Sequence, residues 1–200
     1  MTEKERKYYN RIETELIGQK IQEVYYEEIN YEIDNPNFSE FTTSDIHSVD
    51  MNIILQMENG KLIQILWDNE FYCYGVGFTV IEKINEVQEG FKIWNVTKNS
   101  NWEKLIGKEI SEIKILWDII ERTTTEYENN QTVKSENNIT KLPQTWELSF
   151  DENKIWIATL EIRENESDNY YWADNLTIFF SEKGKEKYKL CENASSQHRV

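Results

Sequence analysis

A nine-residue stretch near the start of the chain returns in the second half with five identical positions. It reads LIGQKIQEV at residues 16–24 and LIGKEISEI at residues 105–113, an offset of 89 residues. Two further blocks recur in the same order at offsets of 93 and then 100 residues. Because small insertions are accommodated in loops, this pattern predicts a chain built from two diverged copies of one unit.

Each copy is expected to begin with a short helix and a strand. At residues 10–13 and 100–103 a polar residue is followed three positions later by Glu, which is the pattern of a helix N-terminal cap. Both helical stretches end at a glycine, Gly18 or Gly107, where a left-handed cap is favoured. Alternating apolar residues then predict strands, which begin near Ile29 and Ile113.

A polar stretch and three strands complete each copy. Residues 34–48 and 123–141 have no apolar period, so we expect two long loops there. Asn59-Gly60 is typical of a type I′ hairpin turn with positive φ at both positions. The turn at 151–153 is its counterpart. The remaining strands are expected at 51–57, 61–67 and 71–81, and again at 145–150, 154–163 and 171–181.

The predicted fold class is therefore α+β, mainly antiparallel β, with two helix-strand-loop-three-strand units packed with pseudo-twofold symmetry. The units span residues 1–84 and 101–190. Residues 85–100 join them, and this connector is too apolar for a flexible linker, so the units are expected to pack as one compact domain. Residues 191–200 are expected to form a flexible tail.

The net charge of −15 restricts the partners of the chain. A negative field repels nucleic acid and anionic membranes and attracts a basic protein. Neither a secretory signal pattern nor an apolar run of membrane-spanning length is present, so a cytoplasmic location is expected. A basic protein partner, with no nucleic acid and no membrane, is the prediction.

No catalytic motif stands out. The two histidines have no neighbour at ligand spacing, and no phosphate-binding loop or nucleophile elbow is present, so neither a metal site nor a cofactor is expected. Three carboxylates beside tryptophans, Asp68, Glu70 and Asp174, could form the acid/base pair of an enzyme acting on carbohydrates or other small molecules. Asp and Asn also initiate turns, and we favour that interpretation.

Acidic and aromatic residues interleave after the first repeated block, which is typical of a surface that binds a basic protein. The same residues would equally suit a solvated strand face. The predicted partner-binding residues are Tyr25, Glu27, Glu28, Tyr31, Glu32, Asp34, Phe38 and Glu40.

The acidic charge, the aromatic-rich strands and the two Leu-Ile-Gly openings resemble the small acidic bacterial immunity proteins of polymorphic toxin systems. The resemblance implies stoichiometric inhibition of a basic toxin without catalysis, and it assigns no residue roles. The predicted function is a non-catalytic, acidic protein-binding module. The alternative is an enzyme or binding protein for a small molecule or carbohydrate, with a carboxylate-lined cleft between the two repeats.

Overall fold

The computed structural model describes residues 1–30, 42–43, 45–71, 74–84, 90–128, 131–162 and 170–190. Its strand pairings are all antiparallel, so the expectation of a mainly antiparallel α+β chain is confirmed. The elements are α1 (Glu3–Leu16), β1 (Ile21–Ile29), β2 (Thr42–Thr43), β3 (Ile46–Val49), β4 (Asn52–Met57), β5 (Leu62–Asp68), β6 (Gly75–Ile81), β7 (Phe91–Asn95), α2 (Ser100–Glu103), β8 (Glu112–Glu128), β9 (Gln131–Phe150), β10 (Asn153–Glu161), β11 (Tyr170–Phe179) and α3 (Glu182–Lys187).

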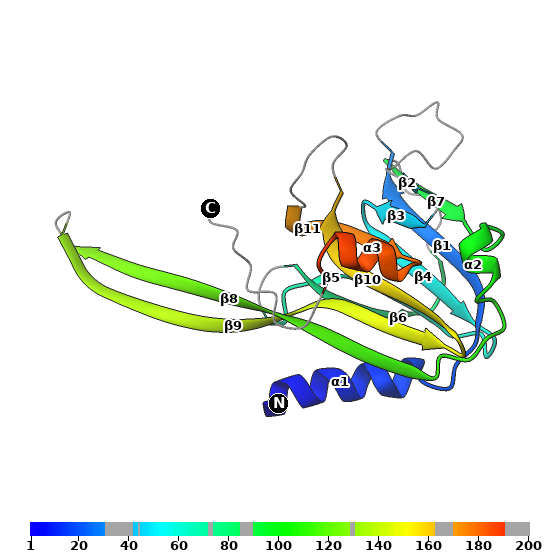
Figure 1. Cartoon of the computed structure of the whole chain (residues 1–200), viewed down its shortest axis with the longest axis horizontal. Helices are drawn as coiled ribbons and strands as arrows, with labels where there is room; N and C mark the ends of the chain where they lie inside the picture. Colours follow the sequence, from blue (N-terminus) through cyan, green and yellow to red (C-terminus); the bar gives the residue numbers. More distant parts are fainter. Residues whose placement is uncertain are drawn as a thin grey trace.

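The strands form two sheets (Figure 1). The first sheet has the order β6-β5-β4-β1-β7, and the second has the order β2-β3-β11-β10-β9-β8. Each half of the chain thus supplies a run of four neighbouring strands, β1-β4-β5-β6 in the first sheet and β8-β9-β10-β11 in the second. The short strands β2 and β3 leave the first half and join the second sheet, where β3 pairs with β11. This crossing lies in a region that was expected to be a loop.

One core lies between the two sheets, because both contribute buried residues to a single cluster. Along β10 the residues alternate: Ile155 and Ile157 join this core, whereas Trp156 and Ala158 belong to a second cluster on the opposite face. The second cluster also contains Tyr188, just after α3. The second sheet is therefore buried on both faces, by the first sheet and by the C-terminal segment.

Helix α1 begins earlier than the sequence pattern indicates. Thr2 and Glu5 form a capping box, in which the Thr2 hydroxyl accepts from the Glu5 backbone and the Glu5 carboxylate accepts from the Thr2 backbone. The pattern at residues 10–13 lies in the middle of this helix and does not cap it. The second helix is capped by Asn99, one residue before the expected position.

The two repeated openings contact each other directly. The Gly18 N–H donates to the Ile110 carbonyl at 2.9 Å, and the Gly107 N–H donates to the Ile21 carbonyl at 2.8 Å. Gly18 and Gly107 have positive φ, 76° and 72°; Gly18 directly follows the C-cap of α1, whereas α2 ends at Glu103 and Gly107 closes the turn after it, so the expectation that this helix ends at Gly107 is wrong. Between these bonds Lys20 forms an antiparallel bridge with Glu109. The openings of the two halves are therefore joined by backbone hydrogen bonds.

The second expected loop is wrong, because residues 123–128 and 131–141 are strand. Strands β8 and β9 extend from the body as a long two-stranded hairpin (Figure 1), paired from Glu112↔Ser149 to Glu128↔Gln131. Residues 123–128 and 131–141 pair through their backbones, although their sequence lacks the apolar alternation that predicts a strand. Pro143 is tolerated in β9 because it lies at a register shift opposite Trp117.

Two further sequence expectations are corrected. The first strand, β1, ends at Ile29, where the alternation pattern placed its start; residues 31–33 lie outside the described part of the chain. The Asn59-Gly60 turn is not type I′, because Gly60 alone of the two has positive φ (82°). The Met57 N–H donates to the Lys61 carbonyl at 2.8 Å, which makes a three-residue loop with a glycine bulge.

The connector at 85–100 contains strand β7, which pairs with β1 from Tyr25↔Asn95 to Ile29↔Phe91. Part of the connector becomes an edge of the first sheet, which accounts for its apolar composition. The tail at 191–200 lies outside the described residues. No helix in the described part of the chain is long and apolar enough to cross a membrane.

Candidate functional site

Strand β1 presents an acidic stripe on one face of the first sheet. Successive side chains of a strand point to opposite faces, and along β1 the buried residues Val24 and Tyr26 enter the core. Glu23, Tyr25 and Glu27 point the other way and keep partial exposure to solvent. We call these three residues the acidic stripe.

The Glu27 carboxylate is held in place by two amides. Its Oε2 accepts from Asn52 Nδ2 at 2.7 Å and from Gln64 Nε2 at 3.0 Å. Asn52 lies directly opposite Glu27 on β4, and Gln64 lies on the next strand, β5. In the described part of the chain these amides are its polar partners, and no cation is paired with it. The carboxylate is therefore oriented without being neutralised.

The Tyr25 hydroxyl donates to Glu23 Oε2 at the other end of the stripe. Burial and the neighbouring Glu23 carboxylate raise the pKa of Tyr25 to about 12. The phenol is therefore protonated at neutral pH and serves as the donor in this bond. Here too the carboxylate has a neutral partner, so the stripe keeps its negative charge.

The structure divides the predicted partner-binding residues. Tyr25 and Glu27 lie in the acidic stripe, whereas Glu28 points to the opposite face of β1 and is only 4% exposed. The reason is the two-residue period of a strand, which sends adjacent acids to opposite faces. The others lie outside the described residues: Tyr31, Glu32, Asp34, Phe38 and Glu40.

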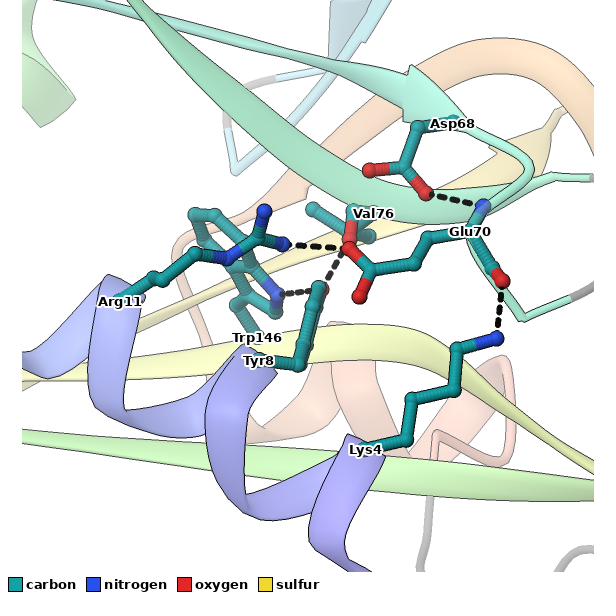
Figure 2. A network of polar contacts seen from close by, with 7 residues as sticks. All are labelled: Lys4, Tyr8, Arg11, Asp68, Glu70, Val76 and Trp146. Atoms are coloured by element: carbon teal, nitrogen blue, oxygen red, sulfur yellow. Dashed lines mark hydrogen bonds and ion pairs between the residues drawn. The ribbon is translucent and has the colours of Figure 1, made fainter.

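Asp68 and Glu70 belong to a network that fixes α1 to the β5–β6 connection (Figure 2). The Glu70 carboxylate forms an ion pair with Arg11, and the Glu70 carbonyl accepts from Lys4 Nζ. Asp68 Oδ1 accepts the Glu70 N–H at 3.0 Å, as in an Asx-type turn. The structure thus brings these two predicted carboxylates together, in a turn of the kind that Asp favours.

The Asp68 carboxylate lies against the backbone of Gly77. A Cβ atom on Gly77 would collide with the carboxylate, so the absence of a side chain there creates its seat. Burial raises the pKa of Asp68, and the Glu70 N–H and the nearby Arg11 and Lys4 oppose the shift. The burial of Asp68 against the Gly77 backbone therefore disfavours the charged form of this carboxylate.

Tyr8 occupies the centre of the same network and is fully buried. Its hydroxyl accepts from Trp146 Nε1 at 2.9 Å and donates to the Val76 carbonyl (Figure 2). The Phe71 and Trp117 rings contact Tyr8 edge-on, at centroid distances of 5.3 and 5.8 Å. These contacts join α1 to strands of both sheets.

The third predicted carboxylate, Asp174, belongs to β11 in the second sheet, and its side chain lies outside what the structure describes. Asp68 belongs to β5 in the first sheet. A described pocket of about 310 Å³ is lined by residues of α1 and β6 and contains none of the three. The predicted cleft between the repeats therefore does not coincide with this pocket.

Several residues of these sites were not predicted from sequence. Lys4, Tyr8 and Arg11 lie three and four residues apart, and this helical spacing was the available signal for a shared face. A glycine inside a strand, such as Gly77, often marks a close approach of another group. No local pattern indicates that Asn52 and Gln64 would hold Glu27, because that contact depends on strand pairing.

In the described part of the chain, no group of three or more His, Cys, Asp and Glu side chains could hold a metal ion. Comparison of the chain with protein families, with characterised proteins and with solved structures finds no match.

Proposed function

We propose that the chain is a non-catalytic protein-binding module that engages a basic partner through the acidic stripe. The Glu27 carboxylate carries this proposal, because it is oriented by the Asn52 and Gln64 amides and no cation among the described residues is paired with it. A carboxylate held in this way is prepared for a bidentate or charge-assisted bond with an incoming Arg or Lys. Because the carboxylate is already ordered, the side chain loses little further conformational entropy when a partner binds.

Other carboxylates of the molecule have different surroundings. Glu15 is paired with Lys61 at 2.5 Å, and Glu147 with Lys154 at 2.6 Å. Burial raises the pKa of Glu147, but the hydrogen bonds from Lys154 and Trp156 outweigh it and hold the pKa below its usual value. These groups have intramolecular partners that stabilise their charge. Glu27 is instead left for a partner of opposite charge.

The net charge of −15 supports the same proposal, because it accelerates the encounter with a basic protein. The more specific form of the proposal is an immunity protein that acts in the cytoplasm and neutralises a basic toxin stoichiometrically. It is supported by the resemblance in charge and aromatic content described above.

The test uses the products of genes adjacent to the one that encodes this chain. Each basic product is titrated with the wild-type chain and with the Glu27→Gln variant at low and at raised salt. Glu152→Gln in the exposed β9–β10 turn is the matched control, because it removes the same charge elsewhere. We expect one basic product to bind the wild type and the control alike. Loss of a charge-assisted bond should weaken Glu27→Gln by about tenfold or more.

Equal binding by Glu27→Gln and Glu152→Gln would contradict the role of the stripe. Absence of any basic partner at low salt would contradict the function itself. If a toxic product binds, inhibition should be complete at one chain per toxin molecule, as expected for a stoichiometric inhibitor.

The raised pKa of Asp68 favours a second candidate function, an enzyme or binding protein for a carbohydrate or other small molecule. A carboxyl whose pKa is raised by burial keeps its proton to higher pH, which is what a general acid requires. Against this candidate, the neighbouring Glu70 is engaged by Arg11. Hydrolysis of a panel of glycosides by the wild type, abolished by Asp68→Asn, would establish the second candidate in place of the first.

We also propose that the molecule arose by duplication and keeps a local pseudo-twofold axis. The two glycine bonds support this proposal, because shifting Gly18 and Ile21 by the repeat offset of 89 gives Gly107 and Ile110. The same shift carries Lys20 onto its own bridge partner, Glu109. A residue that pairs with its own repeat equivalent lies on the axis, as in an isologous dimer contact.

A further inference from the structure

Strand β6 is the outermost strand of the first sheet, and the β4–β5 hairpin determines which of its backbone groups face outward. In an antiparallel sheet, the backbone groups of successive residues bond to the strands on either side in turn. Because Met57 and Lys61 form a hydrogen-bonded pair next to the turn, the backbones of Ile63 and Ile65 bond to β4. The intervening residues of β5 bond to β6 at Gly77, Thr79 and Ile81. The backbones of Val76, Phe78 and Val80 therefore point away from the sheet.

Within the described ranges, two of these outward positions, Phe78 and Val80, have no hydrogen-bond partner for their backbone groups. The Val76 carbonyl accepts from the Tyr8 hydroxyl, which confirms the outward direction. Among the described residues, no backbone or side-chain group bonds to the outward N–H and C=O groups of Phe78 and Val80. Unpaired edge groups of this kind are a template for an added strand.

The pocket of about 310 Å³ lies beside these two positions, between α1 and β6. Its floor is apolar, formed by Phe78 and by Val80, which is 48% exposed. The wall on α1 is polar, formed by Asn10, Arg11, Thr14 and Glu15. A strand added to β6 would direct every second side chain into this pocket, because the side chains of Phe78 and Val80 face it.

We propose that the outer edge of β6 at Phe78 and Val80, with the adjoining pocket, takes one extended segment of a basic partner protein as an added strand. The inference rests on the proposed function for the charge of the partner. The charged side chains in the wall are already paired, Arg11 with Glu70 and Glu15 with Lys61. Apolar side chains of the segment therefore enter the pocket, and Lys or Arg side chains alternate with them in solvent.

The charge of the chain argues against the main alternative occupant, a second copy. Pairing two β6 edges would bring together two bodies of net charge −15, which repel each other. A basic segment gains from the same field. Phe78 and Val80 together offer two N–H and two C=O groups to an added strand. This small number of hydrogen bonds supplies only part of the binding free energy, so the edge is one part of a larger interface with the partner.

The experiment titrates the isotope-labelled full chain with a six-residue peptide of alternating lysine and valine, followed by amide NMR. We expect the amide signals of Phe78 and Val80 to shift and to exchange more slowly with solvent, because they gain hydrogen bonds. The Thr79 amide already bonds to β5 and should change less. A peptide of alternating glutamate and valine should bind about tenfold more weakly because of the chain's negative field.

Two variants block the site in independent ways. Val80→Pro removes an outward N–H without removing a bond to β5, and Thr14→Trp fills the pocket from the exposed side of α1. Each should weaken the lysine–valine peptide by about tenfold. Val80→Thr keeps the N–H and is the matched control. Glu27→Gln should change the affinity for this peptide by no more than about twofold, since the acidic stripe is a separate contact.

The edge site would be overturned, and the proposed function left intact, by one pattern of results. In that pattern the peptide shifts the β1 amide signals, Glu27→Gln weakens its binding, and Val80→Pro and Thr14→Trp do not. No shift at Phe78 and Val80 at millimolar peptide would also overturn it. If the Phe78 and Val80 signals instead shift as the concentration of the chain is raised in the absence of peptide, the edge binds a second copy of the chain. That result would also overturn the proposal.

Discussion

Gly77 and Asp68 fit together because the glycine has no side chain: the Asp68 carboxylate occupies the space that a Gly77 Cβ would need. From that seat Asp68 accepts the Glu70 N–H at 3.0 Å and shapes the β5–β6 connection. The same connection carries Glu70, which Arg11 and Lys4 hold to α1. A single missing Cβ thus sustains the attachment of the N-terminal helix to the first sheet.

Replacement of Gly77 by alanine should therefore destabilise the fold. The added methyl group must displace the carboxylate or the strand, and such overpacking costs about 1–3 kcal/mol in the free energy of unfolding. Urea denaturation measures it. Thr79→Ala, on the exposed face of the same strand, is the control and should change stability by less than about 0.5 kcal/mol.

A double-mutant cycle isolates the cause. If the Asp68 carboxylate is what the new Cβ meets, Asp68→Ala should relieve most of the cost of Gly77→Ala, giving a coupling of about 1 kcal/mol or more. Strict additivity of the two substitutions would show that strand flexibility, and not this contact, explains the glycine.

Tyr8→Phe should be among the most destabilising conservative substitutions in α1. Loss of the hydroxyl leaves the Trp146 indole N–H and the Val76 carbonyl without this partner in the interior, at about 1–3 kcal/mol for each. Tyr9→Phe is a matched control in the adjacent position. Its hydroxyl makes one long bond, 3.4 Å, to the Ile113 carbonyl, and its loss should cost less than about 0.5 kcal/mol. Similar unfolding midpoints for the two variants would contradict the central role of Tyr8.

Sequence reasoning identified those elements whose signal is local. The glycine after α1, Gly18, and the apolar alternation of β8 depend on neighbours in sequence, and both were correctly placed, whereas α2 ends at Glu103, before Gly107. The outer part of the β8–β9 ribbon, residues 123–141, was predicted to be a loop because backbone pairing forms it and its sequence has no apolar alternation. The expected loop at residues 34–48 contains β2 and most of β3, since joining the other sheet leaves no local pattern.

The candidate site shows the same limit. Tyr25 and Glu27 were found by composition, but alternation alone assigns Glu28 to the other face once the strand is known. Asn52 and Gln64 act on Glu27 only because β1, β4 and β5 are neighbours. Strand order is a property of the whole chain, and a local pattern does not contain it.

His47 should make stability depend on pH. It is 4% exposed, and burial lowers its pKa to about 4. His47 Nδ1 lies 2.8 Å from the Tyr26 hydroxyl oxygen, which accepts from Trp102 Nε1 at 2.6 Å, so the ring is held in the buried core where its charged form is disfavoured. The unfolded chain, with an ordinary histidine pKa near 6.5, binds more protons than the folded chain between about pH 4 and 6.5.

Stability should accordingly fall as pH falls through that window, by about 2–3 kcal/mol from this group. The measurement compares the free energy of unfolding at pH 7 and pH 4.5 for the wild type and for His47→Gln. Asp68, whose pKa is raised, acts in the opposite direction at lower pH, and Glu147, whose pKa is lowered, acts in the same direction as His47. Both are present in each protein, so the difference between the two slopes reports His47. Parallel slopes would refute the assignment.

Gly18→Ala and Gly107→Ala should destabilise the chain by similar amounts, because the two glycines play equivalent roles in one hydrogen-bonded junction. Each has positive φ and no neighbouring atom close enough to clash with a Cβ, so the cost is that of the backbone conformation, about 1–2 kcal/mol. Asn tolerates this region better than Ala, so Gly18→Asn and Gly107→Asn should each recover part of the loss. Denaturation of the four variants gives the energies, and amide exchange at residues 18 and 107 shows whether both crossed bonds weaken together. A costly Gly18→Ala beside a neutral Gly107→Ala would mean that the two openings do not share a junction, and the case for a local twofold axis would fail with it.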